Sequence, residues 1–266
     1  SGSSATSKVY DGGVAAAVVA GQLQGVIAGD TVQVGAVGAF DSRHVGTGKA
    51  VATTYTLSGG EGGNYQLAGE TLTADITPRT LTITGTTARD KVYDATVAAP
   101  VQTGVLSGKL AGDDVTAQAV GVFADKNVGS DKPVTVRYDL AGTDAGNYAL
   151  SGQVLSADIT PATLVIHAND ATRAAGAADP GFSININNFL IGDNVSGLSG
   201  ATFFNADAST SLGDYVSGLT GSLSFSTTAT PASGPGLYAI VPGGLLGANY
   251  TIDFQPGVLT VTEAAQ

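Results

Sequence analysis

Two copies of the tetrapeptide Lys-Val-Tyr-Asp, at residues 8–11 and 91–94, offer the clearest chemistry in this chain. A tyrosine ring can stack on a sugar while a neighbouring carboxylate accepts hydrogen bonds from its hydroxyls. The candidate ligand-binding residues on this basis are Tyr10, Asp11, Tyr93 and Asp94. The interpretation that we favour is structural: the tyrosine packs at a strand end, and the aspartate accepts backbone N–H bonds in the following turn.

Each copy also pairs an early lysine with an aspartate near its end, namely Lys8 with Asp75 and Lys91 with Asp158. Such a pair forms a spontaneous amide only in an apolar pocket, because a solvated ammonium group is no nucleophile. The sequence shows no such pocket. We therefore favour a salt bridge or simple proximity, and the presence of Lys-Asp crosslinks stays open.

Acidic turns raise the question of calcium. Asp30, Asp113 and Asp193 each follow a glycine, but no Asp-x-Asp-x-Asp-Gly loop or cluster of oxygen ligands is present. We expect no metal and no cofactor, with calcium as the minor alternative.

Signals for catalysis are weak throughout. The chain has no cysteine, and its two histidines, His44 and His167, occupy non-equivalent positions. No Gly-x-Ser-x-Gly or His-Glu-x-x-His motif occurs. We predict that the protein is not an enzyme and has no catalytic residues.

The charge balance limits the possible partners. Eleven Lys and Arg residues against 22 Asp and Glu residues give a net charge of −11. This argues against nucleic acid and against anionic membrane surfaces. No apolar run is long enough to insert into a bilayer. Without cysteine the small domains have no disulfides to brace them.

The tetrapeptide belongs to a longer repeat. Residues 8–90 align with residues 91–173 without a gap, and roughly half of the positions are identical, which indicates one shared fold. Thr and aliphatic residues alternate at 71–77, 80–84, 132–140 and 154–160. This alternation predicts half-buried strands, and hence an all-β protein of antiparallel modules, as a sandwich or in a β-grasp-like arrangement. Segments 19–29 and 103–112 are predicted as short helices, limited by their glycines.

Two prolines divide the chain into three predicted modules, because proline ends a strand ladder and stiffens a joint. Pro78 and Pro161 give modules at 1–77, 78–160 and a divergent third module at 161–266. The first module lacks a counterpart of 80–84, so its N-terminal strand is expected to be truncated, and residues 1–4 have the composition of a cloning scar. The third carries most of the phenylalanines, and its candidate ligand residues are Phe203, Phe204 and Tyr215.

An Asn-Tyr pair recurs in all three modules. It is interpreted as a structural pin, in which asparagine holds a turn and tyrosine bonds the backbone. With the prolines, the predicted structural residues are Asn64, Tyr65, Asn147, Tyr148, Asn249, Tyr250, Pro78 and Pro161.

The order of these motifs resembles known repeats. Lys-x-Tyr-Asp, Gly-Asp, Phe with Val-Gly, Asn-Tyr-x-Leu and Ala-Asp-Ile-Thr-Pro resemble the YDG-type modules of large bacterial exoproteins. The third module resembles the related MBG-type domain, on Asp179-Pro180 and Asn249-Tyr250. The second module departs from the pattern at Ala95, where the family has glycine. The resemblance implies filamentous haemagglutinin-like adhesins of the cell surface or biofilm matrix, often exported by two-partner secretion.

Together these observations predict a stalk or spacer segment of a secreted bacterial surface adhesin, extended as a rod that projects a distal binding region. The expected partners are neighbouring repeats of the same polypeptide, and the isolated chain is expected to be a monomer. The alternative is a module that binds exopolysaccharide or host glycan, with the third module as its site. The glycan, the organism and the length of the parent protein are open.

Overall fold

The computed structural model describes residues 2–187, 203–204 and 219–264. Its regular structure is β-strand apart from two 3-10 turns, η1 (Gly62–Asn64) and η2 (Ala145–Asn147). The all-β prediction is therefore confirmed. The chain forms two compact units, each of which is described by itself. The first comprises residues 1–87, 101–120 and 136–153, and the second comprises residues 88–100, 121–135 and 154–266.

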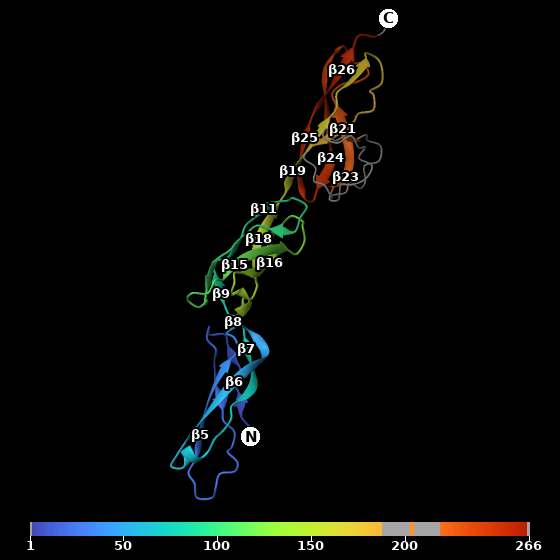
Figure 1. Cartoon of the computed structure of the whole chain (residues 1–266). Coiled ribbons are helices and arrows are strands. Elements are labelled where there is room, and N and C mark those ends of the chain that lie inside the picture. Colours follow the sequence, from blue (N-terminus) through green and yellow to red (C-terminus); the bar gives the residue numbers. More distant parts are fainter. Residues whose placement is uncertain (1, 188–202, 205–218, 265–266) are drawn as a thin grey trace. The chain divides into compact units, whose positions relative to one another are not determined.

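The first repeat, in the first unit, forms a five-stranded sheet in the order β2-β7-β6-β5-β3. Strands β5, β6 and β7 lie side by side in Figure 1 and pair antiparallel. The first strand, β2, instead pairs parallel with the last, β7, with Lys8 opposite Ile76. The bounds are β1 (Ser4–Ala5), β2 (Lys8–Val9), β3 (Ala15–Ala16), β4 (Val18–Val19), β5 (Gln33–Phe40), β6 (Gly46–Ser58) and β7 (Glu70–Thr77).

The sheet of the second repeat has the same plan. Its order, β11-β18-β16-β15-β12, matches the first strand for strand, and β11 again pairs parallel with β18. A parallel pair needs a long connection, which the rest of the repeat supplies between first and last strands. The sheets are therefore mixed, which separates them from the two antiparallel sheets of a sandwich. The bounds are β11 (Lys91–Val92), β12 (Ala98–Ala99), β15 (Thr116–Phe123), β16 (Gly129–Ala141) and β18 (Gln153–Thr160).

Short strands connect the repeats. In the first unit β8 pairs parallel with β17, and β9 pairs antiparallel with β14. The predicted strand at 80–84 is thus interrupted at Leu81, whose side chain is buried in the core. Pro78 lies between β7 and β8, and Pro161 lies between β18 and β19. The bounds are β8 (Arg79–Thr80), β9 (Thr82–Thr84), β10 (Thr87–Ala88), β13 (Val101–Gln102), β14 (Val105–Ser107) and β17 (Tyr148–Ala149).

The third repeat, in the second unit, has two four-stranded sheets, β22-β21-β19-β25 and β20-β26-β24-β23. Strand β19 pairs parallel with β25, and β24 pairs antiparallel with β23 and β26. Its core contains Ala168, Ala229, Ile240, Leu259 and Val261. The bounds are β19 (Ala162–Ala168), β20 (Ala171–Ala174), β21 (Ile184–Asn187), β22 (Phe203–Phe204), β23 (Leu219–Thr227), β24 (Gly236–Gly247), β25 (Tyr250–Gln255) and β26 (Gly257–Thr262).

The core of the first unit joins two repeats. Side chains of the first repeat, among them Tyr10, Phe40 and Ile76, pack with Val115 and Tyr148 of the second. Alternation along β7 places Ala74 and Ile76 inward and the threonines outward, as expected for a half-buried strand.

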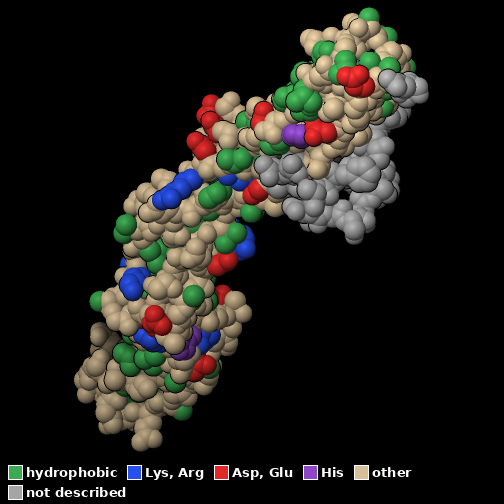
Figure 2. Space-filling view, turned by 90° about the horizontal axis from the view of Figure 1, so that it is seen from above, with side chains coloured by type: hydrophobic (Ala, Val, Ile, Leu, Met, Phe, Trp, Pro, Cys, Tyr) green, Lys and Arg blue, Asp and Glu red, His purple; other side chains and the backbone are tan. Residues whose placement is uncertain are grey.

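The space-filling view in Figure 2 shows scattered charged side chains on a mostly uncharged surface.

The two predicted helices are wrong. Residues 20–24 and 26–27 have no regular structure, and 105–107 form strand β14. Glycines weaken any helix there, while an adjacent strand satisfies the backbone of 105–107 through the β9 ladder.

Candidate functional site

The repeated tetrapeptide joins one repeat to the next. Along β2 and the residues that follow it, Lys8 and Tyr10 point inward while Val9 is 54% exposed, because side chains alternate between the faces of a strand. Tyr10 is fully buried, and its hydroxyl donates to Asp113 Oδ2 of the second repeat at 2.9 Å. The rings of Tyr10 and Tyr148 also pack in a T-shaped arrangement, with centroids 5.4 Å apart. We call this region the first joint.

Asp113 is the centre of the first joint. It accepts a second hydrogen bond from the Tyr148 hydroxyl at 2.6 Å. It also forms an ion pair with Arg43, one of whose guanidinium nitrogens lies 3.3 Å from Asp113 Oδ1. The hydrogen bond from Tyr148 holds the pKa of Asp113 below its usual value, Tyr10 and Arg43 act in the same direction, and burial opposes them. Burial and the hydrogen bond to Asp113 raise the pKa of Tyr10 to about 12. These contacts therefore favour the ionised form of Asp113 and the neutral form of the two tyrosines.

Arg43 bridges two acids of the second repeat. Its second terminal nitrogen lies 2.6 Å from Asp144 Oδ1, and Asp144 also accepts the backbone N–H of Asp114 at 3.1 Å. Asp113 and Asp144 are both buried. A planar guanidinium can contact two carboxylates at once, which a lysine ammonium does less well.

The Asn-Tyr pair of the second repeat completes the first joint. The Asn147 side chain accepts the backbone N–H of Val45 at 3.0 Å, and its amide nitrogen lies 3.3 Å from His44 Nδ1. The Tyr148 hydroxyl accepts the backbone N–H of Leu110 at 3.0 Å. The asparagine thus contacts the preceding repeat, while the tyrosine holds a loop of its own repeat.

The second unit contains an equivalent joint between the second and third repeats. The rings of Tyr93 and Tyr250 pack in a T-shaped arrangement, with centroids 5.5 Å apart. The Asn249 side chain accepts the backbone N–H of Val128 at 2.9 Å. Lys126 takes the aligned position of Arg43 and lies 5.9 Å from the centre of the Tyr93 ring. We call this region the second joint.

The lysine and aspartate of each tetrapeptide form a clip within their own repeat. Lys8 Nζ lies 2.7 Å from Asp11 Oδ1, donates to the Gly13 carbonyl at 2.9 Å, and lies 5.6 Å from the centre of the Phe40 ring. The hydrogen bond from Lys8 lowers the pKa of Asp11. Lys91 repeats the geometry with Asp94 at 2.7 Å and Phe123 at 5.6 Å.

The pairing of Lys8 with Asp75 is not found. Lys8 lies opposite Ile76 in the parallel ladder, so Asp75 points to the other face of its strand, where it accepts the Gly48 N–H at 2.7 Å. In the second repeat Asp158 likewise accepts the Asp131 N–H, and Lys91 contacts Asp94.

The candidate ligand residues fall in different environments. Tyr10 and Tyr93 are 0% and 2% exposed, so neither ring face is open to a sugar, while Asp11 and Asp94 are ion-paired on the surface. Phe203 and Phe204 form strand β22. Tyr215 and Asp193 lie outside the described residues. Within the described residues, no group of three acidic or histidine side chains could hold a metal ion.

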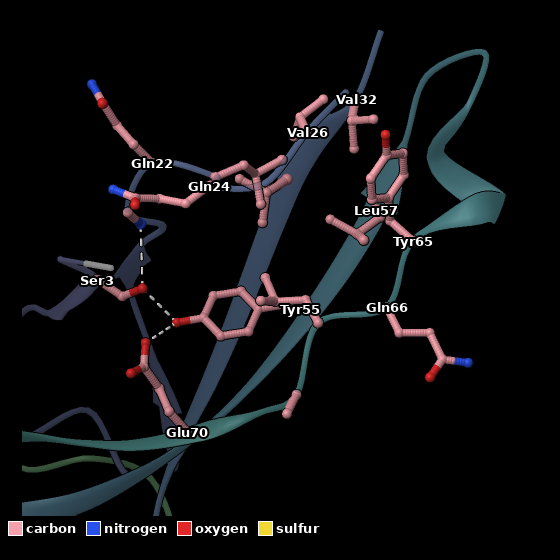
Figure 3. Close-up of a pocket in the computed structure, with 15 residues that line it drawn as sticks. Ser3, Gln22, Gln24, Val26, Val32, Tyr55, Leu57, Tyr65, Gln66 and Glu70 are labelled. Atoms are coloured by element: carbon pink, nitrogen blue, oxygen red, sulfur yellow. Dashed lines mark hydrogen bonds between the residues drawn. The ribbon is translucent and has the colours of Figure 1, made fainter. Parts of the chain in front are cut away.

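The first repeat carries a groove (Figure 3). Its volume is about 260 Å³, and it lies between the loop at 21–26, strand β6 and residues 65–70. The Tyr55 hydroxyl hydrogen-bonds to Glu70 and, at 2.5 Å, to the Ser3 hydroxyl. Ser3 in turn accepts the Gly21 N–H at 3.2 Å.

Residues 2–4 make contacts that recur in the second repeat. Thr86, which aligns with Ser3, accepts the Gly104 N–H at 3.2 Å and the Tyr138 hydroxyl at 2.8 Å. Gly2 and Gly85 align and both have positive φ. Ser3 and Thr86 therefore make matching contacts at equivalent positions of the repeat.

Sequence reasoning missed Arg43, Asp144 and the contacts of Tyr10 across the joint. The sequence does hold one signal for the position of Arg43. Arg43 and Lys126 align as basic residues, and each stands just before the Val-Gly pair that both repeats share. No pattern in one repeat shows that these residues contact the next.

The fold and the joints define a chain of all-β modules in which matching residues connect successive repeats. The chain belongs to the YDG domain family, whose model matches residues 1–74 and 77–157, and an MBG domain (YGX type) matches residues 164–260. Both are adhesin-type, non-catalytic repeat modules typical of extracellular adhesins. None of the helices in the described ranges is long and apolar enough to cross a membrane.

No curated protein matches the chain. Among solved structures, the chain is similar to Drosophila N-cadherin EC1-3, at 8% identity and a TM-score of 0.23, over 98% of each chain. A likeness at that score bears on neither fold nor function.

Proposed function

We propose that this chain is a spacer segment of a secreted bacterial surface adhesin, which holds a distal binding region away from the cell. The observation that supports the proposal most directly is the use of the recurring residues. Tyr10 and Asn147 contact residues of an adjoining repeat, and so does Asn249, whereas a distributed binding site would leave such residues open.

The joints suit a load-bearing spacer. Each combines a buried aromatic contact with hydrogen bonds to backbone and side chains, which together resist bending more than a flexible glycine-rich linker does. The surface is poor in charge, and acidic residues outnumber basic ones, as suits a segment that does not bind polyanions.

A spacer must be extended in solution, and small-angle X-ray scattering tests this. A single compact domain of this length would have a radius of gyration of about 18 Å, whereas three modules in line would have about 28 Å. The spacer function predicts the larger value, at physiological salt and independent of protein concentration. A value near that of the compact domain would contradict it.

Glycan binding is the second candidate function. The groove of the first repeat exposes Gln22, Gln24 and Glu70 beside Tyr55, and such side chains hydrogen-bond sugar hydroxyls (Figure 3). Retention on a panel of bacterial exopolysaccharides and host glycans, with competition by free sugar, would establish it. Binding confined to residues 161–266 would assign it to the third module, and the spacer function predicts no retention by either.

A further inference from the structure

One end of the first repeat copies the receiving side of the first joint. Asp30, Glu61, Asn64 and Tyr65 align without a gap with Asp113, Asp144, Asn147 and Tyr148. Tyr65 donates to Asp30 at 2.6 Å and accepts the Ile27 N–H at 3.0 Å, as Tyr148 does with Asp113 and Leu110. Glu61 accepts the Thr31 N–H at 2.8 Å, as Asp144 does with Asp114.

The two sets of residues differ in burial. Asn147 and Tyr148 are 3% and 6% exposed beneath the first repeat. In the first repeat Asn64 is exposed and Tyr65 is half-buried. The first repeat therefore presents a preformed joint surface with its acids and tyrosine already in place.

The groove beside this end has an equivalent that is filled. At the corresponding place in the second repeat, β14 pairs with β9, the strand that leaves the first repeat, so that Thr82–Thr84 lie against Ser107–Val105, and Leu81 is 2% exposed in the core. The residues of the first repeat that align with β14 are 22–24, which belong to no strand. Val32 and Leu57 line the groove there, and Val32 is half-buried whereas its counterpart Val115 is 2% exposed.

We propose that this end of the first repeat, including the groove, is a docking surface for another YDG-type repeat. The tyrosine of that repeat's Lys-Val-Tyr-Asp donates to Asp30, and its basic residue at the Arg43 position bridges Asp30 and Glu61. Its outgoing Thr-Leu-Thr-Ile-Thr strand adds to residues 22–24 and buries its leucine in the groove. Each of these contacts has its counterpart in the first unit, either in the first joint or in the pairing of β14 with β9 and the burial of Leu81. Two acids that receive one basic residue are also complementary to it in charge.

The inference stands apart from the spacer function, since it concerns only which molecule this surface binds. The experiment makes use of the alignment of the two repeats, in which Ser1 takes the position of Thr84. A second copy of residues 8–83 placed directly before Ser1 continues the repeat in register. Amide hydrogen exchange of this fusion and of the 266-residue chain is then compared over residues 22–34 and 61–67.

The proposal predicts that exchange at residues 23–24 slows at least tenfold in the fusion. A control fusion carries Tyr10→Phe, Leu81→Asp and Ile83→Asp in the added copy alone, and should lose the protection. A shorter extension, of residues 78–83 only, tests the strand without requiring the added copy to fold, and should protect the same amides. Unchanged exchange in both extended proteins, or equal protection in the control, would overturn the proposal. The proposal would also be overturned if added cellohexaose slowed amide exchange in the 266-residue chain while the fusion showed no protection. The surface would then bind a sugar rather than a repeat.

Discussion

The hydroxyl of Tyr10 donates to the carboxylate of Asp113 across a joint between two repeats, and both side chains are buried. In both copies of the tetrapeptide the tyrosine contacts the following repeat, Tyr10 through Asp113 and Tyr148, and Tyr93 through Tyr250. The lysine and aspartate of the tetrapeptide close a clip inside one repeat, while its tyrosine, two residues from the lysine and on the same face, reaches the next. The motif therefore serves both the module and its connection.

Arg43 is expected to stabilise the first joint through the planar shape of its guanidinium group as well as through its charge. Arg43→Gln leaves Asp113 and Asp144 buried without their cation and should lower the free energy of unfolding by about 1–3 kcal/mol. Arg43→Lys should recover less than half of that loss, because one ammonium group cannot hold both carboxylates. Urea unfolding at neutral pH measures both variants, and full recovery by lysine would contradict the bridging role.

Acid should weaken the first joint. The pKa of Asp113 is lowered in the folded state, so its stabilising effect is present above the unfolded pKa and is lost as the pH falls through the folded one. The urea midpoint should therefore decline below about pH 4. Asp113→Asn should be less stable at pH 7 and should lose less on acidification. An identical pH profile in the variant would exclude Asp113 as a source of the acid sensitivity.

Alkali should act through Tyr10. Its pKa is raised to about 12 in the folded state, so the neutral ring stabilises fully below about pH 10, the unfolded pKa, and this contribution is lost as the pH rises toward 12. Tyr10→Phe should flatten the decline of the unfolding midpoint between pH 9 and 12. Tyr238→Phe, an exposed hydroxyl that bonds the Gly234 carbonyl, is the control and should leave the decline unchanged.

Neighbouring glycines in the segment 58–64 should respond differently to substitution. Gly59 has φ +103°, and a Cβ there would lie 2.2 Å from the Thr31 carbonyl oxygen, whereas a Cβ on Gly60 would meet nothing within 4 Å. Gly59→Ala should cost about 2 kcal/mol or more, from the strained backbone and the clash. Gly60→Ala should change stability by no more than about 0.5 kcal/mol. Thermal melting of both variants tests the difference, which would vanish if the turn adjusted freely.

The strands could be predicted because their signal is local. Alternation at 154–160 corresponds to β18 (Gln153–Thr160), and that at 132–140 falls within β16 (Gly129–Ala141). The predicted helices failed because 105–107 gain a ladder with β9, a tertiary partner that outweighs a weak local preference.

The joints could not be predicted in the same way. Asp113 receives Tyr10 and Arg43 from far upstream, and neither spacing has a periodicity that a sequence pattern could reveal. The Asn-Tyr pair was recognisable because it recurs in all three repeats. The sequence predicts that its asparagine holds a turn, and it holds no signal for the contacts in which Asn147 and Asn249 accept backbone N–H groups of the preceding repeat.

The contact between Tyr10 and Asp113 can be measured by a double-mutant cycle of Tyr10→Phe and Asp113→Asn, followed by urea unfolding at pH 7. A hydrogen bond to a buried carboxylate predicts a coupling free energy of about 1 kcal/mol or more. A parallel cycle of Tyr55→Phe and Glu70→Gln, an exposed pair within the first repeat, should give less than about 0.5 kcal/mol. If Tyr10 and Asp113 proved additive within error, the joint would not hold the repeats together through this contact.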